Sequence, residues 1–224
     1  MEVLVVGNTA YVDDDFCAKA FPGDHVKVVA AQEARRDESS PHASWKELLQ
    51  HLEQAYEFDR VVYLSNYLTP HTDTVGDIEL LRSVFRTCAG RRVQLLYVAG
   101  PAGAEGAADA AGRTGKGLIA HAANDLCRYY AAREGVQTKI LRVPFLYTAS
   151  AALEDPFLVP LFDACSTGSA ALQGAQDAAF PLLCAEELSV LVRRIFDSWD
   201  GNFETLDVAD TFHHTVGEVG DALK

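Results

Sequence analysis

The sequence predicts an α/β protein: a doubly wound parallel sheet completed by a small C-terminal lobe. Apolar runs typical of buried strands alternate with helix-like segments as far as about Tyr147. The first run, Met1 to Val6, is nearly continuous, as expected for a strand buried on both faces of a parallel sheet. We therefore expect a main domain over residues 1–147 and a lobe that completes the same fold over 148–224.

Further strands are expected wherever short β-branched and aromatic runs recur between turn signals. These runs are His25 to Ala30, Asp59 to Ser65, Arg92 to Val98, Thr138 to Phe145, and Asn202 to Asp207.

Helices are expected where apolar residues recur at helical spacing or where a capping pattern opens a segment. The first helix begins at Asp13. The Gly/Ala-rich segment Pro101 to Arg113 is expected to be a loop. The other helices are one from Ser44, then Thr74 to Cys88, Thr114 to Arg133, Phe157 to Ser166, Ala185 to Trp199, and one opened by the capping box Thr215 to Glu218. Because Lys224 follows that capping box closely, we expect the chain to be cut from, or to continue into, a longer protein.

Composition indicates a globular chain that binds neither nucleic acid nor a membrane. Its 224 residues are 49% hydrophobic and carry a formal net charge of −13, with no basic run. No stretch has the length and apolarity of a membrane span or the layout of a secretory signal, so we expect a cytoplasmic location. The cysteines are scattered and are interpreted as small apolar residues in a reducing compartment. They are Cys17, Cys88, Cys127, Cys165 and Cys184.

The turn after the first strand has the layout of a nucleotide-binding strand, turn and helix, but it lacks two of the required glycines. Gly7 opens the turn, whereas Ala10 and Asp13 stand where pyrophosphate approach and close helix packing need glycine. The helix begins with Asp13, Asp14 and Asp15, which can cap its free N–H groups. Two unit charges about 4 Å apart repel by roughly 4 kcal/mol at an effective dielectric of about 20, whereas a helix N-terminus favours an anion by only about 0.3–1 kcal/mol. We therefore expect neither NAD nor NADP to bind.

Four segments, in their order and spacing, carry a resemblance to a known family. They are Val3 to Val12, Asp59 to Ser65, Gly135 to Tyr147, and Phe180 to Leu188. Together they resemble the extended short-chain dehydrogenase/reductase family of NAD-dependent epimerases and dehydratases. The resemblance implies a Rossmann-like domain over residues 1–147, a C-terminal substrate lobe, and a homodimer through the helices Thr74 to Cys88 and Thr114 to Arg133. The alanines at 120, 122 and 123 would permit close helix approach, although they could instead pack on the sheet.

This sequence lacks the catalytic residues of that family. The family uses a tyrosine, a lysine four residues later on the same helix face, and a Ser or Thr after the fourth strand. The tyrosine position falls at or near Lys116 and the lysine position near Ala120. The fourth strand runs into Ala99, Gly100 and Pro101, without a hydroxyl. The second strand ends at Ala30, and no acidic residue stands there to bind the ribose of an adenosine.

Other residue groups give no metal site. His213 and His214 are adjacent, so on a strand they face opposite sides and cannot hold one ion together. The carboxylates of Asp13 to Asp15 point in different directions, and capping explains them better than a cation site does. We predict no metal and no catalytic residue.

The most favoured hypothesis is therefore a catalytically inactive epimerase/dehydratase-like domain that acts in ligand sensing or protein interaction, with no cofactor. Strand ends meet at the carboxyl edge of the sheet, where a small neutral or cationic ligand would sit. The alternative is a divergent NAD(P)-dependent epimerase/dehydratase or reductase with a non-standard site, for which Lys116, His121 and Asn124 are candidates. The residues expected at the ligand edge are Gly7, Asn8, Thr9, Ser65, Asn66, Gly100 and Arg142.

Overall fold

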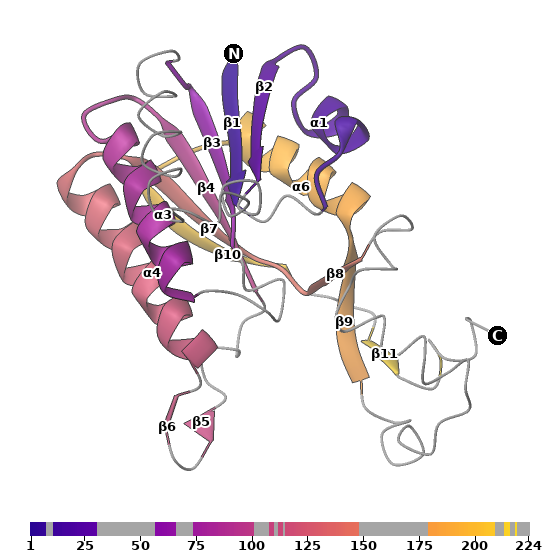
Figure 1. The fold of residues 1–224 in the computed structure, drawn as a ribbon. Helices are drawn as coiled ribbons and strands as arrows, with labels where there is room; N and C mark the ends of the chain where they lie inside the picture. Colours follow the sequence, from indigo (N-terminus) through magenta and orange to yellow (C-terminus); the bar gives the residue numbers. More distant parts are fainter. Residues whose placement is uncertain are drawn as a thin grey trace, which may run out of the picture.

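The computed structural model describes residues 1–7, 11–30, 57–65, 74–100, 108–109, 112–113, 115–147, 179–208, 213–215 and 218. Within them the chain forms a central sheet with helices on both faces (Figure 1). The elements are β1 Glu2–Gly7, α1 Asp14–Ala20, β2 His25–Ala30, β3 Arg60–Leu64, α3 Thr74–Cys88, β4 Gln94–Ala99, β5 Ala108–Asp109, β6 Gly112–Arg113, α4 Gly115–Arg133, β7 Gln137–Arg142, β8 Phe145–Tyr147, β9 Ala179–Cys184, α6 Ala185–Asp197, β10 Phe203–Asp207 and β11 His213–Thr215.

The main sheet is six-stranded, in the order β10, β7, β4, β3, β1, β2. Every neighbouring pair in it is parallel. The predicted Rossmann-like, doubly wound sheet is therefore confirmed. Its strand order reverses between β1 and β3, because β1 leads to β2 on one side while β3 leads to β4 on the other.

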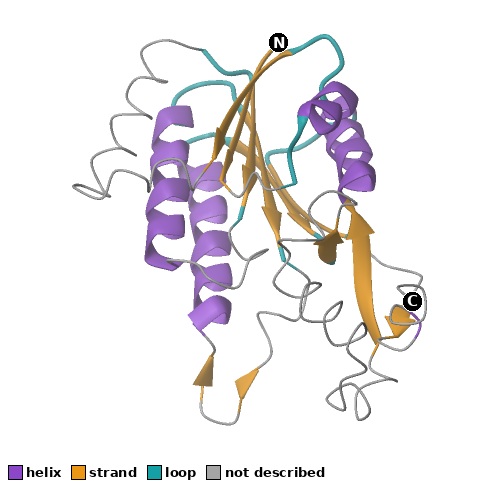
Figure 2. Cartoon of the chain, turned by 45° about the vertical axis from the view of Figure 1, so that its right-hand side comes forward, coloured by secondary structure: helices purple, strands orange, loops and turns teal. Residues whose placement is uncertain are grey.

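Two helix pairs cover the two faces of this sheet. Figures 1 and 2 show α3 and α4 on one face and α1 and α6 on the other. Alternate residues of each strand enter the two cores, so Leu4 and Val6 pack on the α3/α4 side while Val3 and Val5 pack on the α1/α6 side. Strands buried on both faces explain the near-continuous apolar runs in the sequence.

The prediction of one strand from Thr138 to Phe145 is wrong for its C-terminal residues. β7 ends at Arg142, and the Val143 N–H donates to the Ala99 carbonyl at 3.0 Å as the last bond to β4. Pro144 follows and has no N–H to continue the ladder. β8 instead pairs in parallel with β9, which pairs antiparallel with β11 in a second, three-stranded sheet.

Further strands lie where none is predicted from the sequence. β9 lies between the expected helices Phe157 to Ser166 and Ala185 to Trp199, and the two-residue strands β5 and β6 lie in the expected loop from Pro101 to Arg113. These strands are defined by their pairing, β9 with β8 and β11 and β5 with β6, which periodicity along the chain does not reveal.

Most predicted helices are confirmed within a residue or two. α3 has the expected bounds, and α6 ends at Asp197, two residues before the expected Trp199. The capping box is present, because Thr215 N–H donates to Glu218 Oε2 at 2.9 Å and Glu218 N–H donates to Thr215 Oγ1 at 3.1 Å. The helices expected from Ser44 and over 157–166 lie outside the described residues. The division at residue 147 stays a prediction. Beyond it, β10 forms one edge strand of the main sheet and α6 packs against α1.

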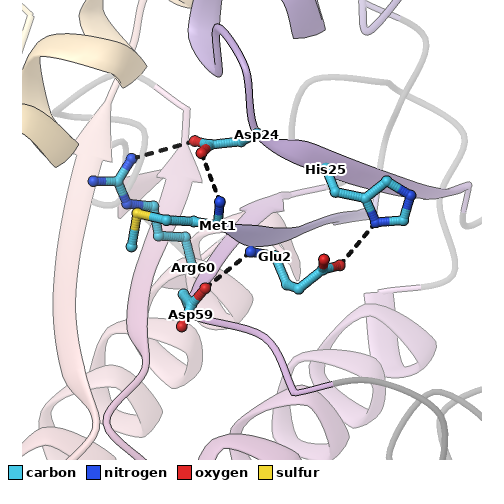
Figure 3. A network of polar contacts seen from close by, with 6 residues as sticks. All are labelled: Met1, Glu2, Asp24, His25, Asp59 and Arg60. Atoms are coloured by element: carbon cyan, nitrogen blue, oxygen red, sulfur yellow. Dashed lines mark hydrogen bonds and ion pairs between the residues drawn. The ribbon is translucent and has the colours of Figure 1, made fainter.

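A network of charges holds the amino edge of the sheet together (Figure 3). Asp24 Oδ1 lies 2.9 Å from the Met1 ammonium, and Asp24 Oδ2 lies 3.7 Å from Arg60 NH1. The Glu2 N–H donates to Asp59 Oδ2 at 2.9 Å, and Glu2 Oε2 lies 2.8 Å from His25 Nδ1. These contacts tie the starts of β1, β2 and β3 to one another.

The C-terminal end of α6 is fixed to the same edge by aromatic and charged contacts. The Arg60 guanidinium lies over the Phe196 ring at 5.0 Å, and Phe196 stacks on Trp199 at 5.4 Å. The Lys139 ammonium lies over the Trp199 ring at 5.4 Å and pairs with Glu204 at 2.6 Å. The Arg60 and Lys139 side chains are largely buried beside these rings and carboxylates, so they hold the end of α6 against β3 and β7.

Candidate functional site

The carboxyl edge between β1 and β3 is the point where the strand order reverses. In open α/β sheets, ligands bind in the crevice outside this point. Gly7 ends β1 here and pairs in register with Leu64 at the end of β3. The candidate site is therefore built from the ends of β1, β3, β4 and β7.

Gly7 has a structural reason to be glycine. Its φ is +110°, a region that side chains other than glycine rarely adopt, and a Cβ atom there would clash with the carbonyl oxygen of Leu64. The two strand ends therefore approach each other too closely for any other residue. The glycine at position 7 is therefore required by the geometry of the sheet, whether or not a nucleotide binds.

The other predicted site residues lie at neighbouring strand ends where they are described. Ser65 is fully buried and its N–H donates to the Val98 carbonyl at 3.0 Å, which extends β3 by one bond. Gly100 is buried directly after β4. Arg142 ends β7, with NH1 3.5 Å from Asp207 Oδ1. Asn8, Thr9 and Asn66 lie outside the described residues.

The N-terminus of α1 is capped as the sequence predicts. Asp13 has extended backbone angles, and its Oδ1 accepts the Phe16 N–H at 2.7 Å. Asp14 and Asp15 are exposed in the first turn, and Asp15 Oδ2 lies 2.6 Å from Lys19 Nζ. The hydrogen bond to Asp15 raises the pKa of Lys19. The Asp13 carboxylate therefore accepts one of the free N–H groups at the helix end where a phosphate lies in dinucleotide-binding sheets.

A buried tyrosine and carboxylate lie beside this edge, on the α3/α4 side. The Tyr63 hydroxyl donates to Asp77 Oδ1 at 2.5 Å and lies 2.9 Å from the Asp77 carbonyl oxygen. Burial, followed by the charge of Asp77, raises the pKa of Tyr63 well above its usual value. Asp77 is in the first turn of α3, where the helix dipole favours an anion. The pair fixes the start of α3 against β3.

The helix α4 carries the positions, near Lys116 and Ala120, where the sequence resemblance places the family's catalytic tyrosine and lysine. Ala120 stands at the lysine position, and the side chain of Lys116 is outside the described part. His121 and Asn124 are both half-buried. Ala122 is exposed, whereas Ala123 is fully buried in the core and packs on the sheet.

The described residues offer neither a metal cluster nor a reactive thiol motif. No group of three or more His, Cys, Asp or Glu side chains among them could hold a metal ion. Cys88 and Cys127 are buried in the α3/α4 core, and burial raises the pKa of Cys127, which keeps the thiol neutral. Cys165 lies outside the described residues. No helix in the described ranges has the length and apolar character needed to cross a bilayer.

Solved structures with the same architecture identify the class of fold. The chain aligns over 99% of its length with 76% of the Bordetella bronchiseptica enzyme WbmF in complex with NAD+ and UDP, at 14% identity and a TM-score of 0.73. It also aligns with UDP-glucose 4-epimerase from Thermotoga maritima with UDP-glucose, over 100% of this chain and 81% of that chain, at 12% identity and a TM-score of 0.70.

A third similar structure is ADP-L-glycero-D-manno-heptose-6-epimerase from Helicobacter pylori, at 11% identity and a TM-score of 0.68, over 99% of this chain and 81% of that chain. No family model and no curated protein matches the sequence. The chain therefore has the fold of the extended short-chain dehydrogenases/reductases, and the resemblance predicted from sequence is confirmed at the level of the fold.

The close approach at Gly7 predicts that Gly7→Ala destabilises the protein more than the same change at another glycine with positive φ. We expect a loss of at least about 2 kcal/mol, because backbone strain adds to a clash with backbone atoms. Gly90→Ala is the matched control, since its φ is +75° but nothing lies within 4 Å of the added Cβ, and we expect about 1 kcal/mol there. Urea unfolding measures both. Equal losses would contradict the steric explanation.

The buried pair predicts that Tyr63→Phe lowers the free energy of unfolding by about 1–3 kcal/mol, because the Asp77 carboxylate loses a hydrogen bond in the core. The change also alters the pH dependence. Tyr63 ionises at its ordinary pKa of 10.0 in the unfolded chain but at a higher pKa when folded. Stability from this group is therefore complete below pH 10 and is lost as pH rises above it.

Urea unfolding at neutral and alkaline pH measures both effects. The alkaline loss of stability should be smaller in Tyr63→Phe than in the wild type. The exposed Tyr129→Phe serves as the control and should change stability by less than about 0.5 kcal/mol. Parallel alkaline curves for wild type and Tyr63→Phe would contradict the assignment.

Proposed function

We propose that the chain is a non-catalytic relative of the NAD-dependent epimerases and dehydratases, with a regulatory role in ligand sensing or protein interaction. The observation that carries the proposal is the cap of α1, where Asp13 Oδ1 accepts the Phe16 N–H at 2.7 Å. In dinucleotide-binding sheets, a pyrophosphate lies at this helix end. Here a carboxylate takes its place.

The remaining residues of the edge do not fit NAD either. Asp14 and Asp15 add two exposed carboxylates to the first turn of α1. Repulsion of roughly 4 kcal/mol between charges about 4 Å apart exceeds the attraction of about 0.3–1 kcal/mol that one helix N-terminus offers. β2 ends at Ala30, so that strand end provides no carboxylate for a ribose.

The positions expected to carry catalysis support the same conclusion. A proton transfer of the family's kind needs a tyrosine and a lysine on one face of the long helix. This chain has Lys116 and Ala120 there, and no tyrosine between Val98 and Asn124. Loss of these groups leaves the sheet and its helices intact.

A small neutral or cationic ligand suits the carboxyl edge better than an anion does. The carboxylates of Asp13, Asp14 and Asp15 would attract a cation at the place where they repel a phosphate. In the sequence, Asn8 directly follows β1, and Ser65 and Asn66 directly follow β3, so a polar ligand could be bound by residues that leave these two strand ends. A ligand there would bridge the two strands whose order reverses.

A thermal-shift experiment tests the proposal. NAD+, NADH, NADP+ and NADPH are each added at millimolar concentration, and we expect no change in Tm. A cofactor present at 100 times its Kd would stabilise the fold by about 2.7 kcal/mol, which corresponds to a rise of roughly 5–10 °C for a domain of this size. WbmF serves as the positive control. A saturable rise for this chain would contradict the proposal.

A second candidate function is a divergent epimerase/dehydratase or reductase that uses NAD or NADP at a non-standard site. It is favoured by the two half-buried polar side chains of α4, His121 and Asn124. If it holds, the wild type turns over a nucleotide sugar in the presence of NAD+ or NADPH, and His121→Ala lowers kcat by about 100-fold or more. The exposed Asp125→Ala is the matched control. Absence of turnover in the wild type would exclude this candidate for the substrates tested.

A further inference from the structure

We draw no further inference here: the strongest candidate, the outer edge of β2 with its exposed Val28, carries no proposal because nothing in the described part of the chain shows what covers this edge of the six-stranded sheet.

Discussion

The close approach of β1 and β3 at their carboxyl ends is the constraint on which the rest of the structure depends. At that point the strand order reverses, and the Leu64 carbonyl leaves no room for a side chain at Gly7. β1 then leads to α1 on one face, while β3 leads to α3 on the other. A glycine that the sequence presents as the remnant of a nucleotide loop is therefore required by the sheet itself.

The two faces of the sheet differ in how their charged side chains are paired. On the α1/α6 side, cations are matched by acids, as in the contacts of Lys139 with Glu204 and of Arg60 with Asp24. On the α3/α4 side, the buried Tyr63 and Asp77 fix the start of α3, while arginines remain exposed on its outer surface.

The sequence predicts the centre of the main sheet well because β1, β3 and β4 are apolar on both faces, a pattern that a single chain reveals. It fails where pairing between distant segments decides the structure. The end of β7 could have been placed from Pro144, whereas β9 forms only through its pairing with β8 and β11. The contact of Tyr63 with Asp77 spans 14 residues across a turn of the fold and leaves no periodic signal. Gly7 was assigned to the right place but not for its physical reason, since sequence cannot distinguish approach to a phosphate from approach to a carbonyl.

An NMR titration of the first-turn amides of α1 with inorganic pyrophosphate tests most directly whether the Asp13 carboxylate keeps a phosphate from this helix end. Asp13 occupies the N–H end of this helix through its bond to Phe16. Asp13→Gly removes the carboxylate while keeping a residue that caps helices at a cost of only a few tenths of a kcal/mol. We expect the Phe16 amide resonance to be unmoved by pyrophosphate in the wild type and to shift in Asp13→Gly. A saturable shift in the wild type, equal to that of the variant, would contradict it.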